Sequence, residues 1–362
     1  MRTRRLVIAA LAVLAASTLA ASTASAATGA ASTITVRPGQ SIQAAVDAAK
    51  PGDTIVVRAG TYHESVTIAK NQITLKGAGA SSGGTVIVPP TTLPDNTCTA
   101  VSEGGSGICV LGQVDLATGQ VRKRVVGVRV TGIQVRGFPG MGVFAFGTQG
   151  LILDHDAGYD NGGYGLARFD STLGSISASK AAGNGEAGIY VGDSPAAHAT
   201  VTGNTVWGNA LGIFLRHDHF VRASGNTAFG NCQGVLVLDD GQPEGAGDVT
   251  VSDNAVHDNN QFCPPTDEAP PLQGGGILLL GATNSRVTGN TVKRNQGAQL
   301  NSGGIVLLSA AMFGGKDASG NVVRENTLAA NQPADLVWDG AGSGNTFNAN
   351  RCATSQPAGL CH

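Results

Sequence analysis

Short aliphatic segments, each beginning at a glycine, recur along the middle of the chain. The glycines are Gly142, Gly165, Gly188, Gly212, Gly234, Gly276 and Gly304. The residue after each of them is aliphatic: Val143, Leu166, Ile189, Ile213, Val235, Ile277 and Ile305. In an extended strand, this residue and the one two positions further on point to the same side. The pattern therefore predicts a series of short strands, each with one apolar side facing a core.

Pairs of asparagines with four residues between them form a second repeat between these strands. The pairs are Asn204/Asn209, Asn226/Asn231, Asn254/Asn259, Asn290/Asn295, Asn326/Asn331 and Asn345/Asn350, preceded by the weaker copies Asp156/Asn161 and Ser179/Asn184. Successive copies are 23, 25, 22, 28, 36, 36 and 19 residues apart. Asparagine tolerates the left-handed backbone of turns and can form a hydrogen bond to the same residue of an adjacent repeat.

Repeats of 22–25 residues that cannot bury their apolar side alone indicate a solenoid of stacked coils. A leucine-rich repeat is disfavoured because its leucine spacing is absent. A propeller blade needs about four strands, which a repeat of this length cannot supply. The prediction is an all-β, single-stranded parallel β-helix in which parallel pairing joins each coil to the next.

The coils and the N-terminal stretch resemble the right-handed parallel β-helix superfamily that includes pectate lyases. The repeats look most like those of sugar-hydrolase-like β-helices and of the nitrous-oxide-reductase maturation family. The matching N-terminal segments are Ile34–Val36, Ser41–Ala49, Asp53–Val57 and Gly60–Tyr62. The resemblance implies a right-handed solenoid with residues 41–49 as a short capping helix. It leaves the chemistry open, because this fold hosts lyases, hydrolases, epimerases and non-catalytic proteins.

The first 26 residues read as a secretory signal peptide. A basic start, Met1 to Arg5, precedes an apolar run and the small residues Ala24-Ser25-Ala26. The alternative is an uncleaved anchor. We therefore expect a secreted protein with a signal peptide at 1–26, a cap and first coils at 27–125, β-helix repeats at 126–350 and a tail at 351–362.

The net charge and the cysteine count limit the binding partners and the compartment that we expect. The net charge of −2 gives no reason to expect nucleic acid or, after signal cleavage, a membrane, and we expect a monomer. Six cysteines in an exported chain indicate three disulfides, and their local spacing suggests Cys98–Cys109, Cys232–Cys263 and Cys352–Cys361. A cysteine metal site is the alternative, but no Cys-x-x-Cys spacing supports it.

The second position after each glycine should point outward, yet it is apolar. It reads Phe144, Ala167, Tyr190, Phe214, Leu236, Leu278 and Val306. Because sugars stack on aromatic rings and exposed apolar patches usually mark contacts, Phe144, Tyr190 and Phe214 are candidate substrate-binding residues. The alternative is that the insertions at 241–248, 260–275, 296–303 and 309–320 cover this strip.

The fifth position after each glycine carries ionisable groups in four successive coils. It reads Gly147, Asp170, Asp193, His217, Asp239, Gly281 and Ser309, with Arg216, Asp218, His219 and Asp240 beside it. Such a column either shifts pKa values or holds a cation. The same counting places Arg168 inward, which is unusual for an unpaired arginine and suggests an error of one position near Gly165.

The first chemistry compatible with this column is β-elimination on a uronate-containing polysaccharide, or the related epimerisation. Ca²⁺ held by Asp193, Asp239 and either Asp218 or Asp240 would neutralise the substrate carboxylate. His217, Arg216 or Tyr190 would transfer protons, and His219 would contact substrate. The segment Arg216–His219 resembles, over only four residues, the His- and Asp-containing motif of alginate epimerases.

Two other functions stay open at this point. An inverting glycoside hydrolase would use Asp193 and Asp239, whose strands lie two coils apart. A non-catalytic binding or metal-handling protein would use His217 and His219 to hold a metal such as copper. We expect an enzyme, with polysaccharide as its partner.

Overall fold

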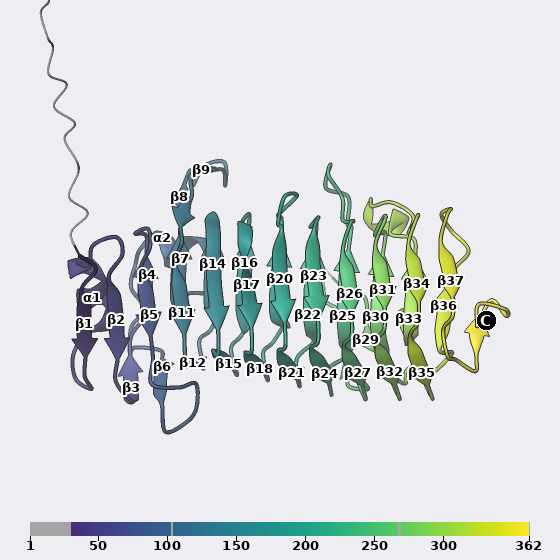
Figure 1. Ribbon diagram of the computed structural model, residues 1–362, viewed down its shortest axis with the longest axis horizontal. Helices are drawn as coiled ribbons and strands as arrows, with labels where there is room; N and C mark the ends of the chain where they lie inside the picture. Colours follow the sequence, from purple (N-terminus) through teal and green to yellow (C-terminus); the bar gives the residue numbers. More distant parts are fainter. Residues whose placement is uncertain (1–29, 103, 267–268, 362) are drawn as a thin grey trace, which may run out of the picture. The chain divides into compact units, whose positions relative to one another are not determined.

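The computed structural model describes residues 30–102, 104–266 and 269–361, so the predicted signal peptide lies outside the described residues. Residues 31 onward form one compact unit. In this unit the chain passes in turn through three parallel sheets, here called A, B and C, and each pass makes one coil (Figure 1). The prediction of an all-β parallel β-helix is confirmed.

The strands of each sheet follow one another along the stack of coils. Sheet A consists of β1 (Thr33–Val36), β2 (Thr54–Val57), β5 (Thr74–Lys76), β10 (Val125–Val126), β11 (Arg129–Thr131), β14 (Thr148–Asp154), β17 (Thr172–Ser177), β20 (Ala199–Thr202), β23 (Val221–Ser224), β26 (Thr250–Ser252), β31 (Arg286–Thr288), β34 (Val322–Arg324) and β37 (Thr346–Asn348). Sheet B consists of β3 (Gly60–His63), β6 (Thr85–Val88), β12 (Ile133–Arg136), β15 (Ala157–Tyr159), β18 (Lys180–Ala182), β21 (Thr205–Trp207), β24 (Thr227–Phe229), β27 (Ala255–His257), β32 (Thr291–Lys293) and β35 (Thr327–Ala329). Sheet C consists of β4 (Val66–Ile68), β7 (Ser106–Leu111), β13 (Met141–Phe146), β16 (Leu166–Phe169), β19 (Ala187–Gly192), β22 (Leu211–Arg216), β25 (Gln233–Leu238), β30 (Gly275–Leu280), β33 (Gly303–Leu308), β36 (Leu336–Trp338) and β38 (Ser355–Gln356).

In the part of the chain that the structure describes, two antiparallel hairpins and three short helices lie outside the three sheets. The hairpins are β8 (Gln113–Val114) with β9 (Val121–Lys123), and β28 (Phe262–Cys263) with β29 (Leu272–Gln273). The helices are α1 (Ile42–Ala48), α2 (Thr97–Val101) and the 3-10 helix η1 (Ala311–Phe313). Within the described residues, no helix is long and apolar enough to cross a membrane.

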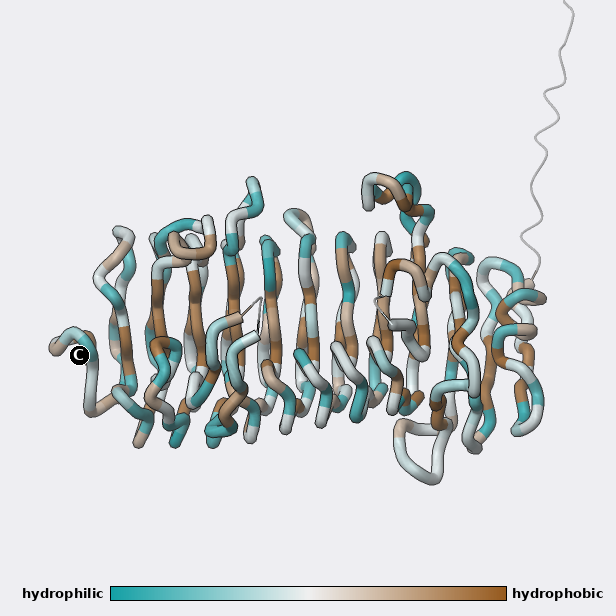
Figure 2. Tube along the Cα trace, turned by 180° about the vertical axis from the view of Figure 1, so that it is seen from behind, coloured by the Kyte–Doolittle hydropathy of each residue, from teal (hydrophilic) through white to brown (hydrophobic). Residues whose placement is uncertain are grey.

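The aliphatic column predicted from the glycine pattern forms the core on the inside of sheet C. Strand pairing aligns Val143, Leu166, Ile189, Ile213, Val235, Ile277 and Ile305 in register. All seven side chains are at most 1% exposed. Figure 2 shows the hydrophobic stretches recurring from coil to coil, with hydrophilic residues at the turns.

Helix α1 lies at the N-terminal end of this core, as the resemblance implied. The Ser41 side chain accepts a hydrogen bond from the Ala44 N–H and so begins the helix. Ile42, Ala45 and Val46 are buried in the core cluster. The helix therefore covers the apolar side chains of the first coil, which has no described coil before it.

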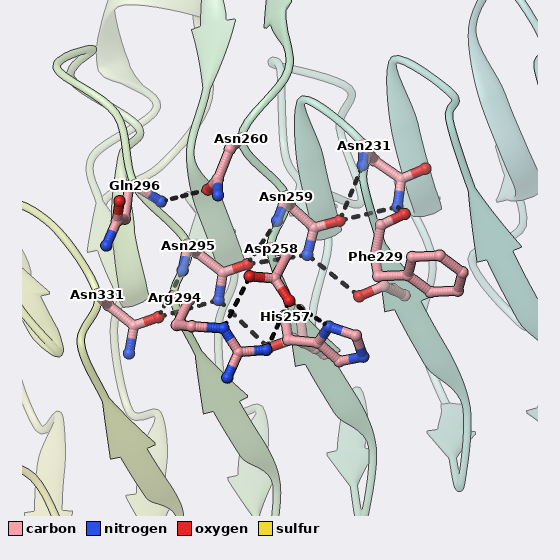
Figure 3. A network of polar contacts seen from close by, with 12 residues as sticks. Phe229, Asn231, His257, Asp258, Asn259, Asn260, Arg294, Asn295, Gln296 and Asn331 are labelled. Carbon is pink, nitrogen blue, oxygen red and sulfur yellow. Dashed lines mark hydrogen bonds and ion pairs between the residues drawn. The ribbon is translucent and has the colours of Figure 1, made fainter.

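Asparagine ladders join the turns of successive coils. The backbone N–H and the Nδ2 of Asn231 both donate to Asn259 Oδ1, at 3.1 and 2.8 Å, and Asn259 repeats this geometry on Asn295 (Figure 3). The ladder ends where Asn331 donates from both nitrogens to the carboxylate of Asp335. Each of these asparagines is buried, and its side-chain amide forms hydrogen bonds within the protein, so the repeat identified in the sequence stabilises the fold.

The last coil corrects the register taken from the sequence. Asn326 donates to Asn350, and Asn321 donates to Asn345, each 24 residues apart, so the final spacing is a whole coil instead of 19 residues. The segment predicted as a tail contributes β38, which pairs with β36 in sheet C. All three disulfides have the pairing suggested by the cysteine spacing.

Candidate functional site

The ionisable column predicted from the sequence lies where β19, β22 and β25 leave sheet C. Pairing aligns Gly192, Arg216 and Leu238 at the ends of these strands. Asp193 and His217 follow directly and take left-handed backbone, with φ of 53° and 52°. This conformation turns both side chains into the same corner of adjacent coils, which brings them together.

The His217 imidazole bridges two carboxylates from different coils. Its Nδ1 lies 2.9 Å from Asp193 Oδ1, and its Nε2 contacts Asp240 Oδ1. The His217 side chain is only 2% exposed, whereas Asp193 and Asp240 are 42% and 24% exposed. The two carboxylates are therefore accessible to solvent, while the buried ring contacts both of them.

Arg216 supplies the positive charge of this cluster. Its Nε and Nη2 donate to Asp240 Oδ2 at 3.1 and 2.8 Å. Burial alone would raise the pKa of Asp240, but the hydrogen bond and charge of Arg216, together with His217, lower it below its ordinary value. Burial likewise opposes the charge on Arg216, yet Asp240 raises the Arg216 pKa overall. Both groups therefore stay charged.

Tyr190 on β19 contacts the same cluster through Asp193. Its hydroxyl lies 3.4 Å from Asp193 Oδ2. Burial raises the pKa of this phenol well above its usual range, and the negative charge of Asp193 adds to the effect. The phenol consequently carries its proton beside an exposed carboxylate.

The aromatic strip is in register, but its rings are buried. The expectation that these rings are exposed for sugar stacking was therefore wrong. Phe144, Tyr190 and Phe214 are 2%, 1% and 8% exposed. Ring centroids of Tyr164 and Phe169 lie 4.6 and 4.5 Å from that of Tyr190. The rings pack on one another along the stack, so their faces are used within the protein.

Asp239 does not join the cluster, although counting from the glycine placed it there. It is 1% exposed, and it lacks the left-handed backbone of Asp193 and His217. Its Oδ1 accepts from the Gly241 N–H at 3.0 Å, and its Oδ2 accepts from the Lys316 N–H at 3.2 Å. Asp239 thus fastens the loops 241–248 and 309–320, and Asp240 takes its expected place. An Asp193/Asp239 hydrolase pair is not formed.

Asp218 and Arg168 lie inside the solenoid. Pairing aligns Arg168 with the inward residues Ala145 and Val191, so the suspected error of register was wrong. Burial lowers the pKa of Arg168 to about 10, an effect that the charge of Asp218 opposes. Burial raises the pKa of Asp218 well above its usual range. An interior carboxylate facing a guanidinium cannot ligate a metal in an outer groove.

His219 belongs to a separate contact set. Its Nδ1 lies 2.9 Å from Asp248 Oδ2, and its Nε2 lies 3.2 Å from the Glu244 carbonyl oxygen. Asp170, one coil before Asp193, forms an ion pair with Arg124. Neither side chain therefore adds to the His217 cluster.

The predicted metal ligands do not assemble into a metal site. Asp218 is interior and Asp239 is occupied by loop amides, so the Ca²⁺ set expected from the sequence is not formed. Both ring nitrogens of His217 already face carboxylates, and His219 is held elsewhere, which removes the expected copper pair. Among the described residues, no three His, Cys, Asp or Glu side chains are arranged to hold a metal ion.

The pH dependence of Asp240 provides a test of this geometry. Its pKa is lower in the folded protein than the ordinary value of about 3.9 expected for the unfolded chain. Its stabilising contribution is therefore present above the unfolded pKa and is lost as pH falls through the folded pKa. We expect Asp240→Asn to lower the free energy of unfolding by about 1–2 kcal/mol near pH 6 and by less as the pH falls below about 3.

Urea unfolding across this pH range measures the difference. The control is Asp253→Asn, a 68% exposed carboxylate 3.9 Å from Arg222, which should change little at any pH. A loss for Asp240→Asn that stays constant from pH 6 to pH 2 would show that its charge plays no part.

The stack of coils, each passing through three parallel sheets, places the protein in the right-handed parallel β-helix class. A family model for the right-handed β-helix region matches residues 54–243. The model of the family described as periplasmic copper-binding protein (NosD) matches residues 154–356, more than half of the chain, and the protein belongs to this family. No curated protein sequence matches the chain.

Several solved structures share the fold. The A-module of mannuronan C-5 epimerase AlgE4 from Azotobacter vinelandii is 20% identical, with 87% of this chain and 91% of that chain covered and a TM-score of 0.59. An alginate lyase from Paenibacillus sp. str. FPU-7 is 18% identical, with coverages of 86% and 99% and a TM-score of 0.59. The DFA-IIIase from Arthrobacter chlorophenolicus A6 is 15% identical, with coverages of 83% and 88% and a TM-score of 0.52. At these identities the likeness extends to the fold alone.

Proposed function

We propose that this protein is a secreted lyase or epimerase acting on a uronate-containing polysaccharide. The observation that carries the proposal is the pair of partly exposed carboxylates, Asp193 and Asp240, which both contact the buried imidazole of His217. A cation and a protonated phenol lie against the same pair, from Arg216 and Tyr190.

Each part of the cluster suits one requirement of this chemistry. Both reactions begin with removal of the proton next to the sugar carboxylate, and the exposed Asp193 carboxylate is the proton acceptor in this proposal. Arg216 stays cationic and binds the substrate carboxylate, which stabilises the charge that develops when the proton leaves. Tyr190 is 1% exposed and keeps its proton 3.4 Å from Asp193, so it positions that carboxylate. In a lyase the protonated Asp193 returns its proton to the departing oxygen on the same face, and in an epimerase water supplies a proton to the opposite face.

The similar structures support this substrate class without fixing it. The A-module acts on mannuronan and the Paenibacillus enzyme on alginate, according to their names, and both share the fold with this chain. The family name refers to copper, but the described side chains do not offer a copper site, so no step here depends on that metal.

A screen of the purified protein on alginate, pectate and glycosaminoglycans tests the proposal. A lyase would create ultraviolet absorbance from an unsaturated product, and an epimerase would change the uronate composition seen by NMR without shortening the polymer. New reducing ends without that absorbance would instead indicate a hydrolase and reject the proposal. No chemical change in any polymer would also reject it and would favour a non-catalytic binding protein.

A further inference from the structure

The outer face of sheet B carries a row of ring side chains contributed by successive coils. Strand pairing aligns the last residues of β15, β18, β21, β24, β27 and β32, which are Tyr159, Ala182, Trp207, Phe229, His257 and Lys293. The residue before each of them is buried, as Val206 and Val256 are, so these six side chains lie on the outer side of the sheet. The four rings among them are only partly buried.

The rings form a continuous row along the stack. The rings of Trp207 and Phe229 are parallel within 6° with centroids 5.9 Å apart, and those of Phe229 and His257 are parallel within 6° with centroids 5.5 Å apart. The Tyr159 ring lies 5.9 Å from the Trp207 ring, across the small side chain of Ala182. Parallel rings in van der Waals contact have planes about 3.5–4 Å apart, so these rings are offset sideways from one another. Each ring therefore leaves part of its surface accessible to solvent.

The charges on this face of sheet B are positive. None of its ten strands contains an aspartate or a glutamate. Lys180 on β18 and Lys293 on β32 lie on either side of the three parallel rings. Across residues 30–102, 104–266 and 269–361, neither lysine has an ion pair or a side-chain hydrogen bond. The two lysines are four coils apart, which is roughly 19 Å at an inter-strand spacing of about 4.8 Å.

The carboxylates that flank β18 to β32 lie at the turns and already face cations. Asp258 accepts from Arg294 Nε and Nη2 at 2.8 and 2.6 Å, and its Oδ2 lies 2.8 Å from His257 Nδ1 (Figure 3). On the other side of the sheet, Asp253 lies 3.9 Å from Arg222. The positive charge of the two lysines is therefore not neutralised by these neighbouring acids.

We propose that the outer face of sheet B is a binding surface for an acidic polysaccharide. The spacing of the coils is close to the length of one sugar unit, so an extended chain lying along the stack places about one sugar on each coil. The rings contact the apolar faces of the sugars, and Lys180 and Lys293 attract their carboxylate or sulfate groups. Thr205 and Thr227, in the same outward column as Lys180, offer hydroxyl groups to the sugar hydroxyls.

A sugar chain suits this surface better than two other polymers. A neutral polysaccharide would leave the two lysines without a partner. A single-stranded nucleic acid also combines negative charge with groups that stack on rings, but its extended repeat is longer than the coil spacing. The inference does not rest on the proposed function, because none of these residues belongs to the carboxylate cluster and the surface binds the polymer without altering it.

The chain carries its own reporter for a test. It has two tryptophans, Trp207 and Trp338. In the Trp338→Phe variant, Trp207 is the remaining tryptophan, and its fluorescence reports on the outer face of sheet B and not on the carboxylate cluster. The acidic probes are hexamers of galacturonate and mannuronate. The comparison probes are the neutral hexamers of mannose and cellulose and a single-stranded oligothymidylate.

We expect a saturable change in Trp207 emission with at least one acidic hexamer, and weaker binding as the salt concentration rises. Lys180→Gln/Lys293→Gln in the Trp338→Phe background should weaken this binding by about tenfold. The matched control is Lys76→Gln/Arg324→Gln, which removes the same charge from exposed positions on β5 and β34 of sheet A and should leave the binding unchanged.

Three results would overturn the proposal. These are a flat response to both acidic hexamers, equal or tighter binding of a neutral hexamer or of the oligothymidylate, and equal affinities for the lysine variant and its control. Because Trp207 emission measures binding at sheet B and the polymer screen measures chemical change, this surface can fail while the carboxylate cluster proves active, and the reverse.

Discussion

Asp193→Asn is expected to lower kcat on a uronate polymer by about 10²- to 10⁴-fold, the usual range for removing a general acid or base. Asparagine keeps the size of the side chain and its contact with His217 but cannot accept the substrate proton. Because Asp193 is 42% exposed, folding should be little affected. Steady-state kinetics on whichever polymer the screen identifies, with an unfolding curve for each variant, measures both quantities.

The repeat supplies a matched control for this change. Asp170 occupies the same turn one coil earlier and also has left-handed backbone, with φ of 37°, but its carboxylate pairs with Arg124. Asp170→Asn should leave kcat within about twofold of the wild-type value, because no other catalytic group of the cluster lies beside it. Comparable losses of kcat for both variants would mean that this column of side chains stabilises the fold. Full activity of Asp193→Asn would mean that Asp193 takes no part in the reaction.

Asp218→Ser is expected to lower the free energy of unfolding by about 3–5 kcal/mol, since it leaves Arg168 charged and alone in the solenoid interior. Among the residues that the structure describes, the three guanidinium nitrogens of Arg168 have no hydrogen-bond partner, and the side chain is 1% exposed. Serine is the natural replacement, because Ser171 and Ser194 precede Asp218 in the same interior ladder. Arg168→Met should cost less, because Asp218 can lose its charge by binding a proton.

The double variant Arg168→Met/Asp218→Ser should recover to within about 1 kcal/mol of wild type, because replacing both members of a buried pair removes the isolated charge. Urea unfolding of all four proteins gives the coupling free energy directly. Losses that simply add in the double variant would show that the two interior charges do not stabilise each other.

The fold could be predicted because its determinants repeat at short range. The glycine near the start of the sheet C strands from β13 to β33 and the asparagines at the turns recur once per coil, and the aliphatic column is in register from Val143 to Ile305. The last coil was misjudged because Asn345 belongs to the ladder of Asn321, which the pairing of asparagines had not included.

The site was predicted less completely because its parts depend on contacts between coils. Register alone brought Asp193, Arg216 and His217 to one corner. It could not show that Asp239 lacks the left-handed backbone of Asp193 and His217, so that Asp240 contacts His217 instead, because Asp239 is held by the amides of two loops. The burial of Tyr190 comes from Tyr164 and Phe169, and the charge facing Arg168 comes from Asp218, two coils away in the stack.

The asparagine ladder that runs from Asn231 to Asn331 ends in an acid, Asp335, and this gives that ladder a direction and an end. Each asparagine along it accepts hydrogen bonds from the preceding coil at Oδ1 and donates from its own nitrogens to the next coil, so a further coil could extend the ladder. Asp335 accepts from Asn331 and, through its second oxygen, from the Ala353 N–H, but its carboxylate has no hydrogen to pass on. At this corner a second molecule would therefore find no further amide donor, which removes one contact through which another parallel coil could add to the stack.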